Sequence, residues 1–402
     1  MNTRKTATVV AVSCFAEVAN LLPYATFPAL IPDLMAEWGL GSGEVGWISG
    51  MGMIGYMLLV PWLMGITDRI DARRVLMFGC ALSAIAPFGF GLFATGFWSA
   101  LVWQTLAGIG LAGCYMPGLK VMTDRVGAAE SSRSIVLYTA SYSVGVGLSF
   151  LLAGWTGATL GWRWAFVIAG TGPCVAFAAV WMLLAPCAPE SRGTASVLSG
   201  FRAVLRNRAA IGYILAYGWH GYELAAHRAW IVAFLVFVAG SGSGLPPPLT
   251  PAVLAAISTF IAMPASVVGN ELAIRFGRRR TLAVLMLVSS LVGVTLGLAA
   301  TQPWWVIVPL VLIYSVTVAI DSGSLTAGTV AAADPHVRGA TIAIHSMVGF
   351  GISALGPLCV GLALDATGGV GTGQGWAFGF AVMAAGAAIG ALCLVIGRGR
   401  GI

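Results

Sequence analysis

The sequence predicts an all-α membrane protein in which twelve transmembrane helices form two pseudo-symmetric bundles of six. The first observation is composition: 58% of the 402 residues are hydrophobic and 9% are charged, whereas soluble domains carry about 25% charged residues. The second is the placement of lysine and arginine, which gather in alternate loops. The third is a repeat, because motifs of the first half return in the second half.

The apolar segments are long enough for a dozen helices, since each span needs about 20 apolar residues. The first segment follows Lys5 and continues past Glu17, so it is too long for the apolar region of a signal peptide. We expect it to remain as the first helix. The predicted spans are 8–32, 44–66, 74–95, 98–122, 134–157, 163–186, 211–238, 250–273, 281–300, 304–330, 340–364 and 375–397.

The longest polar break separates six spans from six. It runs from Ala188 to Asn207 and is rich in arginine. We therefore expect an N-terminal bundle over residues 1–187, a cytoplasmic linker over residues 188–208 and a C-terminal bundle over residues 209–402.

The distribution of basic residues predicts the topology. With the N-terminus inside, the cytoplasmic segments hold 18 of the 21 lysines and arginines, as the positive-inside rule requires. The other three are Lys120 and Arg228, within helices, and Arg163, in a short outer turn. We expect both termini on the cytoplasmic side of the cytoplasmic (inner or plasma) membrane. The net charge of +7 follows from this topology, so we expect no nucleic-acid partner.

Two pairs of features indicate a duplication with one offset. The basic loop that begins at Arg69 returns at Arg275, and 275 − 69 = 206. The acids Glu17 and Glu223, deep in the first and seventh spans, are also 223 − 17 = 206 residues apart. A parallel repeat of six helices explains both.

The loop after the second span carries a family resemblance. Residues 65–74 read Gly-Ile-Thr-Asp-Arg-Ile-Asp-Ala-Arg-Arg and resemble the motif of Gly followed by Asp-Arg-x-Gly-Arg-Arg in the major facilitator superfamily. The loop departs from that motif in two ways. Asp71 replaces the usual glycine, and Gly65 lies one residue closer to Asp68.

Three other segments resemble the same family, so the resemblance covers essentially the whole chain. The second copy of the loop keeps Gly277 but has Ile274 where the acid would fall. Residues 161–166 (Gly-Trp-Arg-Trp-Ala-Phe) and 334–339 (Asp-Pro-His-Val-Arg-Gly) are also typical of the family. The resemblance implies the fold of that superfamily, with substrate transported between two bundles by alternating access.

The seventh span contains the densest set of ionisable groups. His220, Glu223, His227 and Arg228 follow at i, i+3, i+7 and i+8, so they share one helix face. Each ionisable group costs roughly 2.5–3.5 kcal/mol in hydrocarbon on insertion scales. The face therefore looks into protein or a water-filled cavity. It is either part of a transport site or a buried ion-pair network, in which Arg228 pairs with Asp321 or with Glu223.

Three buried acids are candidates for proton coupling: Glu17, Glu223 and Asp321. Glu17 lies about 14 Å into the first span at 1.5 Å per residue. Low solvation disfavours the charged form of a carboxyl, so such a group can take up a proton on one side and release it on the other. The alternative is a permanent pair with a cation.

Candidate substrate-binding residues lie on the same helices. Asn20 and Tyr24 follow Glu17 at i+3 and i+7, and Gln104 stands where resembling families often carry arginine. Arg228 offers a rigid fork for a carboxylate or another oxyanion. His345 lies about five residues into the eleventh span, where we expect a cytoplasmic gate. The full candidate set is Asn20, Tyr24, Gln104, His220, His227 and Arg228.

The basic loops are the candidate gate. We expect them to form a cytoplasmic latch when the inner side is closed, although they also signal topology. The gating candidates are Asp68, Arg69, Arg73, Arg74, Arg275 and Arg279.

The leading hypothesis is a monomeric, proton-coupled secondary transporter of a small polar or anionic organic solute. The alternatives are an exporter of drugs or metabolites and a transition-metal transporter. The fifth span lacks the Gly-Pro pair of drug/proton antiporters, and the methionines at 51, 53 and 57 fit packing better than metal binding. Without a nucleotide-binding loop, a nucleophile constellation or a firm metal cluster, we expect no enzyme, cofactor or bound metal.

Overall fold

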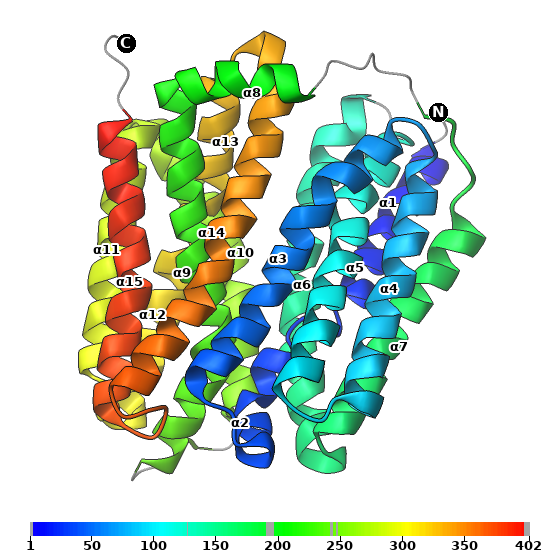
Figure 1. Ribbon diagram of the computed structural model, residues 1–402. Coiled ribbons are helices and arrows are strands. Elements are labelled where there is room, and N and C mark those ends of the chain that lie inside the picture. The colour runs from blue at the N-terminus through cyan, green and yellow to red at the C-terminus, as the bar shows by residue number, and fades with distance from the viewer. Residues whose placement is uncertain (1–2, 127, 190–196, 242–243, 247, 398–402) are drawn as a thin grey trace. The chain divides into compact units, whose positions relative to one another are not determined.

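The computed structural model describes residues 3–126, 128–189, 197–241, 244–246 and 248–397, and within them every regular element is helical (Figure 1). The predicted all-α class is confirmed. The helices are α1 Thr3–Asn20, α2 Thr26–Trp38, α3 Ser42–Thr67, α4 Ala72–Phe93, α5 Phe97–Thr123, α6 Ala128–Leu160, α7 Trp162–Leu183, α8 Val197–Arg206, α9 Arg208–Gly240, α10 Pro251–Phe276, α11 Arg278–Leu298, α12 Trp304–Ala319, α13 Ser322–Ala332, the 3-10 helix η1 Pro335–Val337, α14 Arg338–Ala366 and α15 Gly373–Ile396.

The helices have the length and composition of membrane spans. In the described part of the chain, 11 helical segments are long and apolar enough to cross a membrane, with Trp304–Ala332 counted as one of them. A shorter apolar helix, Thr6–Asn20, lies in the first predicted span. Together with the start of α2 it covers most of that span, so each of the twelve predicted spans contains helix.

The chain divides into two compact units. Unit 1 is Met1–Leu40 with Met51–Gly193, and unit 2 is Gly41–Gly50 with Thr194–Ile402. Part of α3 therefore belongs to each unit. The linker predicted at 188–208 contains α8, and its bounds stay a prediction.

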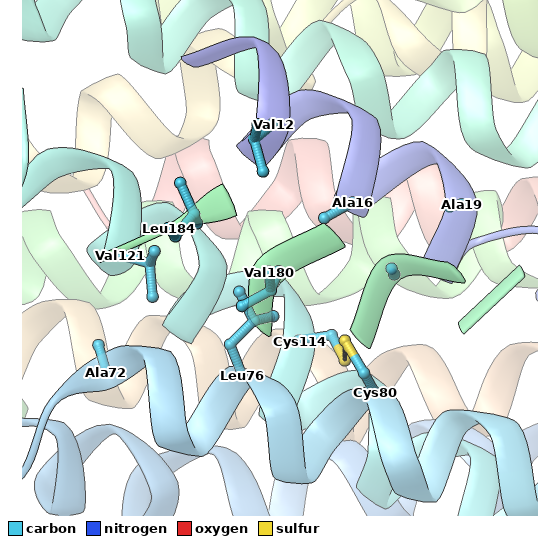
Figure 2. Packing of buried hydrophobic residues seen from close by; sticks show 11 residues of the cluster. Val12, Ala16, Ala19, Ala72, Leu76, Cys80, Cys114, Val121, Val180 and Leu184 are labelled. Carbon is cyan, nitrogen blue, oxygen red and sulfur yellow. Dashed lines mark hydrogen bonds between the residues drawn. The ribbon is translucent and has the colours of Figure 1, made fainter. Parts of the chain in front are cut away.

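In unit 1 the core lies where α1, α4, α5 and α7 meet. Figure 2 shows Val12 and Ala16 of α1, Leu76 and Cys80 of α4, Cys114 of α5 and Val180 of α7 in one cluster. The Cys80 and Cys114 sulfurs are 3.9 Å apart. Small residues permit this closeness, because a Cβ on Gly79 would stand 2.4 Å from the Gly113 carbonyl carbon. Small-residue contacts of this kind are typical of helices packed in membranes.

In unit 2 the core surrounds α9, which packs against α14, α15 and α13. Asn207 starts α9, because its side chain accepts a hydrogen bond from the Ala210 N–H (3.1 Å). Its amide also donates to the Ala332 carbonyl (2.8 Å), which places the start of α9 beside the end of α13. The first turn of α3 also belongs here: the Asp365 carboxylate accepts hydrogen bonds from the Ser42 and Gly43 N–H groups at 2.8 and 2.7 Å.

Two spans are broken. The first stops at Asn20 and resumes at Thr26. Ser149 of α6 holds the break, because its hydroxyl accepts from the Ala25 N–H (2.8 Å) and donates to the Leu22 carbonyl. The tenth span breaks at Ile320–Asp321, between α12 and α13. Non-helical backbone at membrane depth is tolerated only where protein or a cavity satisfies it.

Hydrogen bonds and an ion pair connect the loop between α3 and α4 to the ends of three helices in unit 1. Asp71 caps α4 by accepting from the Arg73 N–H (3.0 Å), pairs with Arg125 (3.0 Å) and accepts from the Cys187 N–H (2.9 Å). Arg73 donates to the Val180 and Trp181 carbonyls at the end of α7. Burial alone would raise the pKa of Asp71, but the bonds from Cys187, Arg73 and Arg125 lower it below its usual range.

Replacing Asp71 tests these connections. We expect Asp71→Asn to lower the free energy of unfolding by about 1–3 kcal/mol, because it leaves buried donors without a charged acceptor. The lowered pKa means that the stabilisation is complete above the unfolded carboxyl pKa and is lost as pH falls through the folded pKa. The difference between wild type and variant, followed by thermal unfolding in detergent, should therefore be constant from pH 5 to 8 and shrink below about pH 4. Asp68→Asn, at an exposed position of the same loop, is the control; equal effects of the two changes would contradict the assignment.

Candidate functional site

The centre of unit 2 is built on α9 around the Glu223 carboxyl. This side chain is 1% exposed. The Ser289 hydroxyl of α11 and the Tyr314 hydroxyl of α12 both donate to its Oε1 atom at 3.0 Å. The Asp321 carboxyl interacts with it electrostatically. Glu223 is thus surrounded by neutral donors and another acid.

One turn further along α9, His227 binds a different hydroxyl. Its Nε2 atom lies 3.1 Å from the Ser315 Oγ, and its ring meets the Tyr314 ring edge-on, with 5.2 Å between centroids. The Ser315 hydroxyl itself donates to the Val311 carbonyl (2.7 Å). The hydrogen between His227 and Ser315 is therefore carried by Nε2 of the imidazole.

One turn before Glu223, His220 pairs with an acid. Its Nδ1 atom lies 2.7 Å from the Asp321 Oδ1, and the two side chains are 2% and 4% exposed. The contact has an ion-pair distance without hydrogen-bond geometry, since within the described residues neither atom has a hydrogen-bond partner. The pairing of Arg228 with Asp321 or with Glu223 stays a prediction. Arg228 is half-buried, and its charge acts on Tyr217 and His227.

A further imidazole lies towards the start of α9. The His345 ring of α14 stacks on the Tyr217 ring at 3.9 Å between centroids, and its Nδ1 atom is 3.2 Å from the Thr329 hydroxyl. Tyr217 also lies 5.9 Å from the His220 ring. His345 is 5% exposed, so it is a core group of unit 2 and not a surface residue at its end.

In unit 1 the candidate acid is Glu17, near the end of α1. It is 5% exposed, and its Oε1 atom has no hydrogen-bond partner among the described residues. Cys14, Cys114 and Tyr138 are the groups whose charge or hydroxyl acts on it. The Tyr138 hydroxyl donates to the Tyr115 carbonyl (2.9 Å). The groups that act on Glu17 are therefore thiols and a hydroxyl, whereas Glu223 also has a second acid, Asp321, within electrostatic reach.

The other unit 1 candidates do not form the predicted stripe. Asn20 is 5% exposed, and its Oδ1 atom also lacks a partner in the described structure. The helix ends there, so Tyr24 lies in the break and does not continue the face of Glu17; its ring meets Tyr142 edge-on at 5.8 Å. Gln104 is half-buried on α5, with its backbone carbonyl towards Gly52 of α3.

The predicted gating residues fall into two groups. Arg73 and Arg279 make their contacts within their own units. Arg73 donates to carbonyls of α7, as described above. Arg279 donates to the Ala209 carbonyl (3.4 Å) and lies over the Tyr213 ring (5.2 Å). The others are exposed at the loops. They are Asp68, Arg69, Arg74 and Arg275. A latch formed by these loops stays a prediction.

Several residues of the site were not predicted from the sequence. Ser289, Tyr314 and Tyr138 carry lone hydroxyls inside apolar helices, and nothing in their spacing connects them to a particular acid. For the metal alternative, the described residues contain no group of three or more His, Cys, Asp or Glu side chains arranged to hold an ion.

The chain is similar in sequence to a family of membrane transporters. The family model of the Major Facilitator Superfamily matches residues 13–251. "Probable sphingolipid transporter spinster homolog 1" of Arabidopsis thaliana is 28% identical over 135 residues, 34% of this chain and 27% of that protein. "Gallate transporter" of Pseudomonas putida is 27% identical over 197 residues (46% and 41%), and "Niacin transporter NiaP" of Acinetobacter baylyi is 27% identical over 146 residues (35% and 32%). The chain spans less than half the length of these relatives.

Solved structures share the fold over nearly the whole chain. A bacterial homolog of the human lysosomal transporter Spinster, inward-facing and unoccupied, has a TM-score of 0.76 at 17% identity and covers 99% of this chain and 96% of its own. The nucleoside transporter NupG has a TM-score of 0.75 at 15% identity, with 99% of each chain covered.

A double-mutant cycle tests the Glu223 cluster. We expect Tyr314→Phe to lower the free energy of unfolding by about 1–3 kcal/mol in the wild-type background, because a buried carboxyl loses a donor. In the Glu223→Gln background the same change should cost less, and the coupling should fall between about 0.5 and 3 kcal/mol. The measurement is thermal or denaturant unfolding in detergent of the four proteins. Additive effects would show that Tyr314 acts on stability without Glu223.

Proposed function

Because the chain belongs to the major facilitator superfamily of membrane transporters, we propose that it couples the movement of a small polar or anionic organic solute to protons. The match of the family model over residues 13–251 is the premise. The family match does not give the coupling ion, the solute or the direction of transport. We also propose that the protein is a monomer in the cytoplasmic membrane with both termini inside. The distribution of basic residues favours this orientation.

The observation that carries the proposal is the pair of buried glutamates at equivalent positions of the two units. Glu17 and Glu223 are 5% and 1% exposed, and the neighbours that act on them are hydroxyls, thiols and, for Glu223, another acid. A carboxylate that was permanently charged would need a cation nearby to offset its desolvation. Groups in such surroundings change protonation when their access to water changes, which is the property that a coupling site needs.

The chemistry of the solute is suggested by two further observations. His227 and Arg228 follow Glu223 on α9 by about one turn, and an arginine fork suits a carboxylate. Two of the relatives are named for gallate and niacin, which are aromatic carboxylic acids. An amphiphilic lipid is the second candidate. One relative is named a probable sphingolipid transporter and spinster homolog, and one solved structure is a bacterial homolog of Spinster.

Transport in proteoliposomes tests coupling. The probes are radiolabelled nicotinate and gallate, with sphingosine as the lipid arm. We expect a pH gradient to drive uphill accumulation in the wild type, and Glu17→Gln or Glu223→Gln to abolish it while counterflow persists, because a fixed neutral amide cannot carry a proton. Glu271→Gln, at an exposed position of α10, is the matched control and should accumulate normally.

Three outcomes would overturn the proposal or one part of it. Uphill accumulation that is unchanged in both glutamine variants would remove the coupling role. Uptake of all probes that ignores the pH gradient in the wild type would remove proton coupling itself. Uptake of sphingosine without nicotinate or gallate would replace the solute class with a lipid.

A further inference from the structure

We propose that the His220–Asp321 pair is a proton site of its own, and that Tyr217 and His345 connect it to the basic end of unit 2. That end carries the arginines that start α9, α11 and α14, and we predict it to be cytoplasmic. The inference rests on the proposed coupling function, in which Asp321 was a candidate and His220 was expected to bind substrate. It assigns His220 and His345 to the proton route instead.

The distance within the pair allows the two groups to share one proton. Nδ1 of His220 and Oδ1 of Asp321 are 2.7 Å apart, and neither atom has a hydrogen-bond partner in the described structure. With one added proton the pair is an imidazolium beside a carboxylate and carries no net charge. Without it the pair carries one negative charge in a poorly solvated core. Because Asp321 acts electrostatically on Glu223, the proton content of the pair affects the charge that Glu223 can hold.

Asp321 lies where the backbone of the tenth span is not helical. Asp321 lies in the break between α12 and α13, outside both helices. The break is packed tightly, since a Cβ on Gly269 of α10 would stand 1.7 Å from the Ile320 carbonyl oxygen. Broken helices of transporters commonly carry ion sites, because their free ends supply polar groups at membrane depth.

The route from the pair leads along α9 towards its start. Tyr217 lies three residues before His220, about 4.5 Å along the axis at 1.5 Å per residue. Its ring is 5.9 Å from the His220 ring and stacks on His345 at 3.9 Å. The charges of His220 and His345 act on each other. Protonation of one therefore opposes protonation of the other, and a proton that leaves the first favours occupation of the second.

His345 is oriented to accept that proton. The Thr329 hydroxyl donates to the Leu325 carbonyl (3.1 Å), so the hydrogen between Thr329 and His345 belongs to Nδ1 of the imidazole. The Nε2 atom of the neutral ring is then an acceptor. Thr329 lies eight residues beyond Asp321, about 12 Å closer to the basic end along α13. The imidazolium of His220 loses one ring N–H proton to the Tyr217 hydroxyl oxygen or to a water. That oxygen releases its own proton to Nε2 of His345, so one N–H bond breaks at His220, one forms at His345 and the relay group is restored.

The surroundings of the route contain few other charges. From α10 and α11 come the neutral hydroxyls of Ser266, bound to the Gly323 N–H, and Ser289. The titratable or charged groups that face the route are Tyr217, Glu223, His227 and Arg228 of α9, Tyr314 of α12, Asp321 of the break and His345 of α14.

The chain has only four histidines, so NMR of histidine-labelled protein in nanodiscs tests the inference without a substrate. We expect the ring carbon and nitrogen shifts of both His220 and His345 to change in a titration from pH 3 to 9. In Asp321→Asn, His220 should remain neutral to lower pH and the midpoint of His345 should move. His227→Gln is the control, because His227 contacts Ser315 and should leave the other midpoints unchanged. His336, exposed in η1, is the internal reference.

A static ion pair predicts a different result. It would keep His220 in one protonation state throughout the titration, and Asp321→Asn would not change His345; either result overturns the inference. The wild-type titration alone decides the first point, so a variant that fails to fold does not remove the test.

Transport separates this inference from the proposed function. With the nicotinate probe, His345→Gln should slow uptake driven by the pH gradient by about tenfold and leave counterflow unchanged. Wild-type protein that ignores the gradient would refute the proposed function whatever the NMR shows. Gradient-driven uptake that is normal in His345→Gln would refute the route alone.

Discussion

The cost of burying a carboxyl inside an apolar bundle determines how unit 2 is arranged. Glu223 lies in the middle of the 33-residue α9, where an ionisable group without partners costs several kcal/mol. Hydroxyls from α11 and α12 meet at its Oε1 atom, so one carboxyl links three helices. The same helix brings His220 to the break at Asp321 and His227 to Ser315. Helix α9 therefore positions the buried polar side chains of unit 2.

The helices were predictable because hydropathy and length determine where a chain can cross a membrane. The seventh predicted span, 211–238, lies within α9 at Arg208–Gly240. The two breaks were not predicted. The first contains Pro23 and the second contains Asp321, but prolines also lie inside continuous helices, such as Pro61 of α3, so neither residue type by itself locates a break. A break depends on partners from elsewhere, such as the Ser149 hydroxyl that satisfies the backbone at Leu22 and Ala25.

The polar face of α9 was predictable, but its partners were not. Helical periodicity places His220, Glu223 and Arg228 on one face without giving the depth of the residues that meet them. Opposite charge suggests that Arg228 pairs with Asp321 or with Glu223, and that pairing stays a prediction. The contact that the sequence did not predict is the one between His220 and Asp321, at 2.7 Å. It depends on the depth of Asp321 in the bundle, which the sequence does not state.

The two units place their breaks differently around equivalent acids. The span that carries Glu17 stops three residues after it, whereas the helix that carries Glu223 is continuous. In unit 2 the break occurs in the tenth span and adds Asp321, a second carboxyl within electrostatic reach of Glu223. Glu17 has thiols and a tyrosine as its acting neighbours. The repeated units thus give acids with different surroundings, and under the proposed coupling such acids would exchange protons at different points of a transport cycle.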